Sequence, residues 1–287
     1  MNLSVLASYV KTATYHLYTM YLFTKSDVKT ILLPITIFAV AAAPTTSLCR
    51  FVHCTFWTWF HLLQFCVSNQ CLSPEEDARN KPWRPIPSLR LSVTQASALR
   101  WALLPLCLLV SACYNVMTLG IIFATSVILH NELKLGSHWF TRNALNAMGY
   151  ATFDSAATLI AQTDRTHTSD ASAITAYYIS TLVIFTTIHA QDFQDEKGDR
   201  WEGRRTIPIV MPEAGRISMP VTLIFWSVLL SFHWGSSTVI SGLLLSLGTL
   251  VGLRFTLLRT PEADRISYIL YNVWLAIARI VPLYCDM

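Results

Sequence analysis

The amino-acid sequence predicts an all-α integral membrane protein with nine transmembrane helices. Of its 287 residues, 53% are hydrophobic and only 13% are charged, whereas soluble domains carry about 25% charged residues. Apolar runs of about 20 residues, the length that crosses a bilayer, recur along the chain. They cover residues 30–48, 51–69, 97–115, 116–131, 143–161, 174–191, 218–234, 236–255 and 266–284.

Two parts of the chain are distinguished by this pattern. Residues 1–29 mix lysines with tyrosines and are interpreted as an interfacial segment that leads into the first span. Residues 30–287 contain no linker rich in Gly or Ser, so a single transmembrane domain is expected there. Within it, residues 111–120 are expected to form a tight hairpin or a kink between two spans.

The distribution of basic residues supports nine spans. If the spans alternate in direction, all but three of the 21 Lys and Arg residues lie on one side of the membrane; the exceptions are Arg50, Arg165 and Arg279. Under the positive-inside rule that side is cytosolic. A phosphate-bearing substrate would also gather basic residues on one face, so either cause places the chemistry there.

An acid-rich stretch, residues 191–208, follows the sixth span. Asp192, Asp195 and Asp199 fall at i, i+3 and i+7, which places three carboxylates on one face of a helix. Their mutual repulsion would be relieved by a hard divalent cation such as Mg2+, which prefers oxygen ligands. Arg204 and Arg205 follow, and Arg binds phosphate through two donors at once. The alternative is a solvated loop of mixed charge.

A second acid-rich stretch, residues 69–88, follows the second span. Asn69, Ser73 and Asp77 recur every four residues, and Pro74 either interrupts their helix or begins a new one. Basic residues follow here too. Two such clusters on the same membrane face are expected to hold a metal-bridged phosphate from two sides.

These two stretches resemble the two Asp-rich signatures of the UbiA superfamily of intramembrane prenyltransferases, and the resemblance covers nearly the whole chain. Asn69–Asp77 with the following Asn-Lys-Pro-x-Arg-Pro is similar to the first signature, and Asp192–Asp199 with Gly-Arg-Arg-Thr-x-Pro is similar to the second. The resemblance implies nine helices around a central cavity and a polyprenyl diphosphate bound through Mg2+.

The first signature departs from the family pattern, because Ser73 replaces the usual middle aspartate. In this respect the motif resembles a fungal branch of the superfamily that includes membrane-bound terpene cyclases of secondary metabolism. Residues 131–136, with Arg142, also resemble that branch.

The resemblance implies the roles of individual residues. The implied metal ligands are Asn69, Ser73, Asp77, Asp192, Asp195 and Asp199, and Asp77, Asp195 and Asp199 are the implied catalytic residues. The implied diphosphate-binding residues are Arg79, Lys81, Arg84, Arg142, Lys197, Arg204 and Arg205.

Two further features concern the membrane interior. Asp154 lies inside an apolar span, where a lone acid indicates either a function or a partner. Aromatic rings attract cations and are candidates for lining a cavity that holds a carbocation. They are Trp57, Phe60, Phe65, Tyr150, Phe153, Tyr177, Tyr178 and Phe185.

Three functions remain open at this point. The favoured one is a terpene cyclase that ionises farnesyl or geranylgeranyl diphosphate with Mg2+. The second is a prenyltransferase that moves the prenyl group to an acceptor, and the third is a membrane carrier without catalysis. The expected partners are the prenyl diphosphate and the lipid bilayer but no nucleic acid, and the expected location is the endoplasmic reticulum with the charged face in the cytosol.

Overall fold

The computed structural model describes residues 3–43, 47–162 and 171–281, and within these ranges the chain is helical and forms no β-strand. In chain order the elements are α1 (Leu3–Thr24), the π-helical turn η1 (Val28–Leu32), α2 (Leu33–Ala41), α3 (Leu48–Leu72), α4 (Pro74–Asn80), α5 (Val93–Cys113), α6 (Met117–Val127), the π-helical turn η2 (Ile128–Glu132), the 3-10 turn η3 (Leu135–Ser137), α7 (Trp139–Ala161), α8 (Ala171–Thr187), the 3-10 turn η5 (Ile188–Gln191), α9 (Asp192–Trp201), α10 (Ile207–Val210), α11 (Pro212–His233), α12 (Thr238–Leu257) and α13 (Pro261–Ile280).

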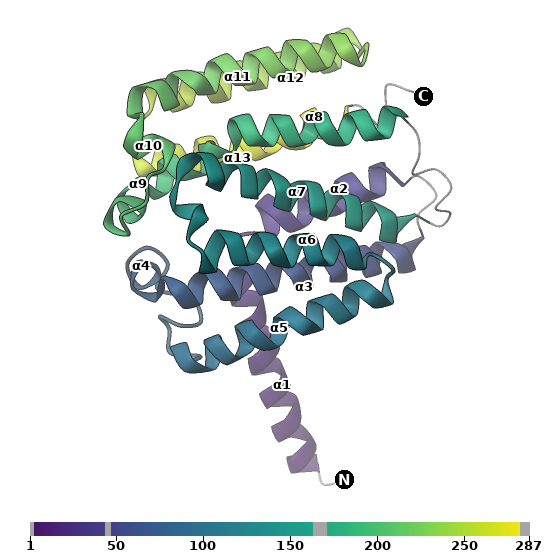
Figure 1. Ribbon diagram of the computed structural model, residues 1–287, viewed down its shortest axis with the longest axis vertical. Helices are drawn as coiled ribbons and strands as arrows, with labels where there is room; N and C mark the ends of the chain where they lie inside the picture. The colour runs from purple at the N-terminus through teal and green to yellow at the C-terminus, as the bar shows by residue number, and fades with distance from the viewer. Residues whose placement is uncertain (1–2, 44–46, 163–170, 282–287) are drawn as a thin grey trace.

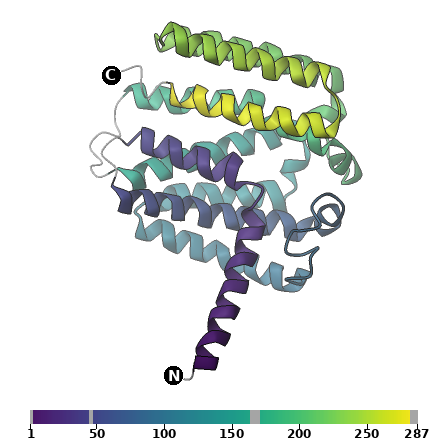
Figure 2. The same cartoon turned by 180° about the vertical axis from the view of Figure 1, so that it is seen from behind.

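Apart from α1, the long helices run roughly parallel or antiparallel to one another and form one bundle (Figure 1). Helix α7 lies inside it and packs against α2, α3, α6 and α8. Helices α11 and α12 form an antiparallel pair at one edge, which Figure 2 shows from behind. The short helices α4, α9 and α10 gather at one end of the bundle, where the two acid-rich stretches therefore lie.

Each of the nine apolar ranges coincides with a helix or with a helix extended by a π or 3-10 turn, where it is described. By length and composition alone, α5, α11 and α12 are the three helices of the described chain that suffice to cross a membrane. The other helices are shorter or contain polar side chains that turn inward, such as the buried Gln64 of α3. Residues 44–46, Arg165 and the end of the last predicted span lie outside the described residues.

Of the two expectations for residues 111–120, a tight hairpin or a kink, the structure has the hairpin. Helix α5 ends at Cys113 and α6 begins at Met117. Asn115 supplies the turn with a φ of 55°, a region that Asn tolerates better than most residues. The two helices approach closely because Gly120 has no side chain: a Cβ there would lie 2.4 Å from the Ser111 Oγ.

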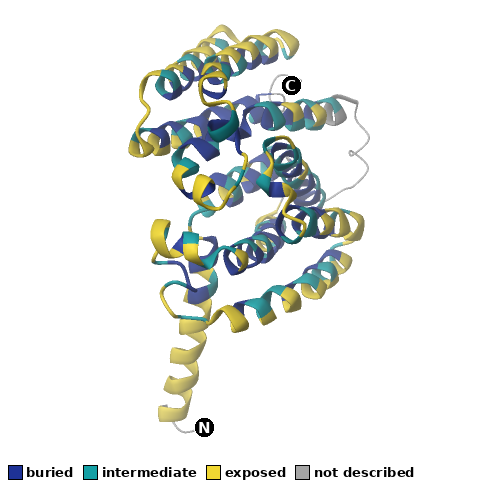
Figure 3. Cartoon of the chain, turned by 60° about the vertical axis from the view of Figure 1, so that its left-hand side comes forward, coloured by how far each residue is buried: buried dark blue, intermediate teal, exposed yellow. Residues whose placement is uncertain are grey.

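Helix α1 projects away from the bundle and crosses the direction of its helices (Figures 1 and 2). Most of its side chains are exposed, as Figure 3 shows, and Tyr9 and Leu17 are each 68% exposed. The second half of the helix is anchored. Arg90 donates to the Tyr15 carbonyl and to the Thr19 Oγ1, at 3.0 Å each, and in the last turn the Gln70 Nε2 donates to the Phe23 carbonyl at 2.8 Å.

The acid inside the apolar span has a partner. Asp154 of α7 forms an ion pair with Arg279 of α13, and both side chains are almost fully buried. The Arg279 Nε also donates to the Ser180 Oγ of α8 at 3.1 Å. A lone buried charge is costly, and here each charge is the partner of the other. Together with the bond to Ser180, the pair connects α7, α8 and α13.

Candidate functional site

The two acid-rich helices meet at one end of the bundle. Helix α3 ends at Leu72 and Pro74 begins α4, so Asn69 and Asp77 belong to different helices. Pro is favoured at a first helical position because its missing N–H is not needed there. Helix α4 packs against α9 at Gly198, where a Cβ would lie 2.6 Å from the Asn80 Nδ2 and 3.1 Å from the Glu76 Oε1.

The second acid-rich stretch forms the predicted helix, α9. Asp192 begins it, and Asp195 and Asp199 follow on the same face. Asp192 and Asp199 are buried, at 1% and 0% exposed. Asp195 is only partly buried.

Three buried aspartates are each paired with an arginine through a single oxygen. In these pairs the Arg84 Nη1 donates to the Asp77 Oδ1 at 2.5 Å, the Arg142 Nε to the Asp192 Oδ1 at 2.9 Å, and the Arg204 Nη1 to the Asp199 Oδ1 at 2.7 Å. The Oδ2 atom of each of these aspartates is buried and has no hydrogen-bond partner among the described residues. Buried acceptors without partners are uncommon in proteins.

This donor set fits a divalent cation. The free atoms are carboxylate oxygens, which Mg2+ prefers. Burial raises the pKa of Asp192 to about 7, and burial also raises the pKa values of Asp77 and Glu76 above their ordinary range. A divalent cation beside these carboxylates would favour their ionised form. In the part of the chain that is described, no three His, Cys, Asp or Glu side chains are already gathered around one point.

Arg204 connects the two stretches. Besides Asp199, it contacts the Glu76 Oε2 at 3.1 Å and donates to the Ser73 Oγ at 3.4 Å. Ser73 therefore lies beside Arg204 on the polar side of the bundle's end, and its predicted role as a metal ligand stays a prediction.

Arg142 connects the site to the loop before α7. Its Nη1 donates to the Gly136 carbonyl at 3.2 Å while its Nε holds Asp192. The same loop is joined to the chain after α9, because the Arg205 N–H donates to the Ser137 carbonyl at 2.6 Å. These bonds place the loop over the acidic helices.

The remaining predicted phosphate-binding residues lie further out. Lys81 and Asp195 line one hollow together with Arg142. Arg79 is exposed and stacks on Trp201, with its Cζ 4.2 Å from the ring centroid. The side chains of Lys197 and Arg205 are exposed.

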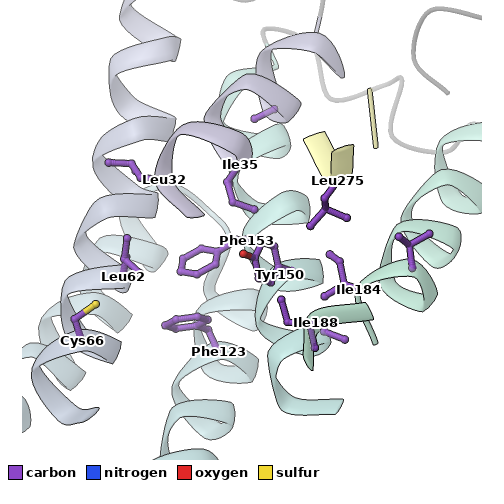
Figure 4. Packing of buried hydrophobic residues seen from close by; sticks show 14 of the residues in the cluster. Leu32, Ile35, Leu62, Cys66, Phe123, Tyr150, Phe153, Ile184, Ile188 and Leu275 are labelled. Atoms are coloured by element: carbon purple, nitrogen blue, oxygen red, sulfur yellow. The ribbon is translucent and has the colours of Figure 1, made fainter. Parts of the chain in front are cut away.

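A polar hollow lies next to the arginines of the acidic cluster, and an apolar cavity shares His130 with that hollow. The polar hollow is lined in part by Asn69, Ser73, Arg142 and Arg204. The apolar cavity lies between α3, α6 and α7, and several of its aromatic walls are labelled in Figure 4. Its aromatic residues are Phe65, Phe123, Tyr150 and Phe153.

Three of the eight aromatic candidates, Phe65, Tyr150 and Phe153, therefore lie on the cavity, and the other five are not among its lining residues. Phe123 was not predicted from the sequence. Nor was His130, which lines both the hollow and the cavity. The sequence signal that could have indicated His130 is its place near the end of the apolar run 116–131, directly before the polar loop 131–136.

The fold and site define a helical membrane protein in which arginine-paired acids gather at one end of the bundle, and two of these arginines line a polar hollow that shares His130 with an apolar, aromatic cavity. The chain belongs to the UbiA prenyltransferase family, whose family model matches residues 31–276. It is an integral membrane enzyme of the terpene synthase or prenyltransferase kind.

Relatives of both kinds are similar to this chain. Fumagillin beta-trans-bergamotene synthase af520 of Aspergillus fumigatus is 30% identical over 271 residues, which cover 93% of this chain and 92% of that protein. Polyprenyl transferase eriF of Hericium erinaceus is 31% identical over 199 residues, covering 64% of this chain and 65% of that one.

The fold is also that of solved structures. A UbiA homolog from Archaeoglobus fulgidus bound to GPP and Mg2+ superposes with a TM-score of 0.64 at 16% identity, over 92% of this chain and 98% of that one. At this identity the likeness concerns the fold alone.

Proposed function

We propose that this protein is a Mg2+-dependent terpene cyclase that ionises farnesyl or geranylgeranyl diphosphate and cyclises the resulting carbocation. One observation carries the proposal: three buried aspartates each leave one oxygen without a partner among the described residues. The arginine partners of two of them, Arg142 and Arg204, line a polar hollow that shares His130 with a cavity of aromatic walls. A bergamotene synthase that is similar over 93% of the chain supports the cyclase over the transferase.

The acidic cluster would hold the diphosphate through the metal. Asp77, Asp192 and Asp199 offer their free Oδ2 atoms, and Asn69, Ser73 and Asp195 complete the proposed ligands. When bound, Mg2+ would neutralise the charge that grows on the leaving diphosphate. Ionisation of the allylic C–O bond becomes easier as that charge is stabilised.

Basic side chains would bind the same group directly. Arg142 and Arg204 line the polar hollow, and Lys81 lines the adjacent one. Arg84 acts through Asp77, which it holds in place. Arg79, Lys197 and Arg205 remain proposed contacts that require their exposed side chains to turn toward the substrate.

The cavity would keep the carbocation away from water. Its walls are mainly apolar, and rings such as those of Phe123 and Phe153, whose centroids are 4.6 Å apart, present faces that attract a cation. Folding of the prenyl chain within this space would set which carbons join.

A prenyltransferase is the second candidate function, supported by the similarity to polyprenyl transferase eriF. It shares the ionisation step and differs in what attacks the cation. A carrier without catalysis does not agree with the family to which the chain belongs.

We further propose nine membrane-spanning helices, with α1 at the membrane interface and the acidic end of the bundle in the cytosol, in the endoplasmic reticulum. The transverse course of α1 and the basic residues near the acidic helices support this orientation. Labelling of single introduced cysteines by an impermeant maleimide in sealed microsomes tests it. A cysteine at Lys197 should react from the cytosolic side without opening the vesicles.

The enzymatic test uses microsomes that contain the protein. Farnesyl or geranylgeranyl diphosphate is added with Mg2+ and without an acceptor, and the extract is analysed by gas chromatography with mass detection. A cyclic hydrocarbon that disappears with EDTA and with Asp195→Ala supports the cyclase. If no product forms until an acceptor is added, the prenyltransferase is correct instead.

A further inference from the structure

His130 lies at the boundary between the polar hollow and the apolar cavity and lines both. It belongs to the π-helical turn η2, directly after α6. Its side chain is buried, with the residue only 8% exposed. A ring in this position is close to the place where a prenyl chain would begin and where its diphosphate would leave.

One nitrogen of this ring is unused. The Nδ1 lies 2.8 Å from the Asn131 Oδ1, and the Asn131 Nδ2 in turn donates to the Ser68 Oγ at 3.1 Å. An amide oxygen only accepts, so the Nδ1 carries the proton and the Nε2 bears a lone pair. That Nε2 is buried and has no hydrogen-bond partner in the described part of the chain.

The orientation of the ring is held by its neighbours. A Cβ on Gly136 would lie 2.5 Å from the Cε1 and 2.6 Å from the Nε2, so the ring packs directly on this glycine. Phe65 packs edge-on from the other side, with ring centroids 5.6 Å apart. A side chain in place of this glycine would displace the ring and move its Nε2.

The other polar residues on the cavity are not comparable proton acceptors. The Ser126 Oγ donates to the Ile122 carbonyl at 2.8 Å, and the Tyr150 hydroxyl donates to the Thr30 carbonyl at 3.0 Å. Asn146 offers an amide, which is not a base at neutral pH. His130 is the basic nitrogen among the residues that line this cavity.

Resting on the proposed cyclase function, we propose that the His130 Nε2 is the base that ends the reaction by removing a proton from the cyclised carbocation. A C–H bond next to the cationic carbon breaks, its electron pair forms the C=C bond of the product, and the proton moves to the Nε2. The imidazolium donates through its Nδ1 to the Asn131 Oδ1. It then returns the proton to the departing diphosphate in the polar hollow, so that one prenyl diphosphate yields one hydrocarbon and one protonated diphosphate.

The position of His130, between the polar hollow and the apolar cavity, suits it to this step. Ring closure brings a distant double bond of the chain back to the carbon that lost the diphosphate. The cationic carbons of the folded chain therefore lie near the mouth, within reach of a ring that borders both spaces.

The test compares His130→Gln with the wild type and with a matched control, His61→Gln. Glutamine keeps a neutral polar side chain but accepts no proton at neutral pH. His61 is also buried, but both of its nitrogens have partners, the Trp57 carbonyl at 2.9 Å and the Ser111 Oγ at 2.9 Å. Diphosphate release and hydrocarbon products are measured on the same microsomes, with Mg2+ and the prenyl diphosphate that the wild type converts.

We expect His130→Gln to release diphosphate within about fivefold of the wild-type rate, because ionisation does not use this base. The share of the wild-type hydrocarbon among all products should fall at least about tenfold, in line with the contribution of a positioned base, and alcohols and double-bond isomers should replace it. His61→Gln should keep the wild-type share.

An unchanged share in His130→Gln would overturn the inference and identify another base, such as the diphosphate itself. Loss of diphosphate release in parallel with all products would also overturn it, since His130 would then act in binding or ionisation. If His130→Gln does not accumulate in the membrane, Gly136→Ala takes its place, because the added methyl displaces the same ring. A wild-type protein that forms no hydrocarbon without an acceptor would refute the proposed function and this inference together.

Discussion

Two buried aspartates, one on α13 and one on α9, differ in one respect. Asp264 of α13 is 1% exposed and Asp199 of α9 is 0% exposed. Arg216 binds both oxygens of Asp264, its Nη1 reaching the Oδ1 and its Nη2 the Oδ2 at 2.9 Å each. Arg204 binds only one oxygen of Asp199, and the other has no partner among the described residues.

Under the proposed function, the difference distinguishes a structural ion pair from an aspartate whose second oxygen is left for a ligand. A buried charge is stabilised when every lone pair is used, and Asp264 meets that condition. Asp199, Asp77 and Asp192 share the incomplete pattern, and all three belong to the acid-rich stretches. Three aspartates at one end of the bundle therefore leave the same kind of atom free, which supports the proposed cation site.

The largest effect is expected from Asp199→Ala. Turnover of the prenyl diphosphate should fall by about 10²–10³-fold or more, as it does when a group that stabilises transition-state charge is removed. Arg204 would still be paired with Glu76, so the fold should persist. Diphosphate release, measured alongside the melting temperature of the detergent-solubilised protein, checks both statements. An active Asp199→Ala protein would contradict the metal role.

The reverse result is expected from Asp264→Ala. The change leaves Arg216 buried without its carboxylate, and breaking such a pair costs about 3–5 kcal/mol of stability. The melting temperature should fall clearly, while the activity of the remaining folded protein should stay within about twofold of the wild type, since this pair lies outside both hollows. If Asp264→Ala is stable but inactive, the distinction between the two pairs is wrong.

The sequence predicted the helices and the acidic stretches because both follow from local patterns. Apolar runs of spanning length and aspartates spaced by a helical turn are visible in the sequence without tertiary information. The partner of Asp154 was expected but not identified, because Arg279 lies 125 residues away along the chain. The residues proposed as metal ligands came from the motifs, and their roles remain predictions.

Other parts of the site depend on contacts between distant segments. Arg204 reaches Ser73 across 131 residues of sequence, and no local pattern predicts that contact. His130 was missed for a related reason. A single histidine at the end of an apolar run is common, and only the folded structure shows that it lines both the apolar cavity and the polar hollow. Whether a given carboxylate oxygen has a hydrogen-bond partner likewise depends on the folded structure and is not visible in the sequence.

A smaller effect is expected from ligand binding to the wild type. Mg2+ with inorganic pyrophosphate should raise the melting temperature, because a ligand present at 100 times its Kd stabilises the folded state by about 2.7 kcal/mol. The Asp264→Ala protein should show the same upward shift from its lower starting point. Asp199→Ala should show little or none. An equal shift in all three proteins would mean that the pyrophosphate binds without the acidic cluster.

The smallest effect is expected from Ser73→Ala. Ser73 contributes one hydrogen bond from Arg204, at 3.4 Å, and no charge. Arg204 keeps shorter contacts to Asp199 and Glu76, at 2.7 and 3.1 Å. A weak hydrogen bond contributes about 1 kcal/mol or less, so turnover at saturating Mg2+ should change by less than about fivefold.

Titration of Mg2+ in the diphosphate-release assay distinguishes the two roles open to Ser73. If it only orients Arg204, Ser73→Ala should leave the Mg2+ concentration for half-maximal activity nearly unchanged. A rise of about tenfold or more would instead make the serine a metal ligand. In that case the first acid-rich stretch would bind the cation through a neutral oxygen where the family pattern has an aspartate, and Ser73→Asp should then strengthen Mg2+ binding relative to the wild type.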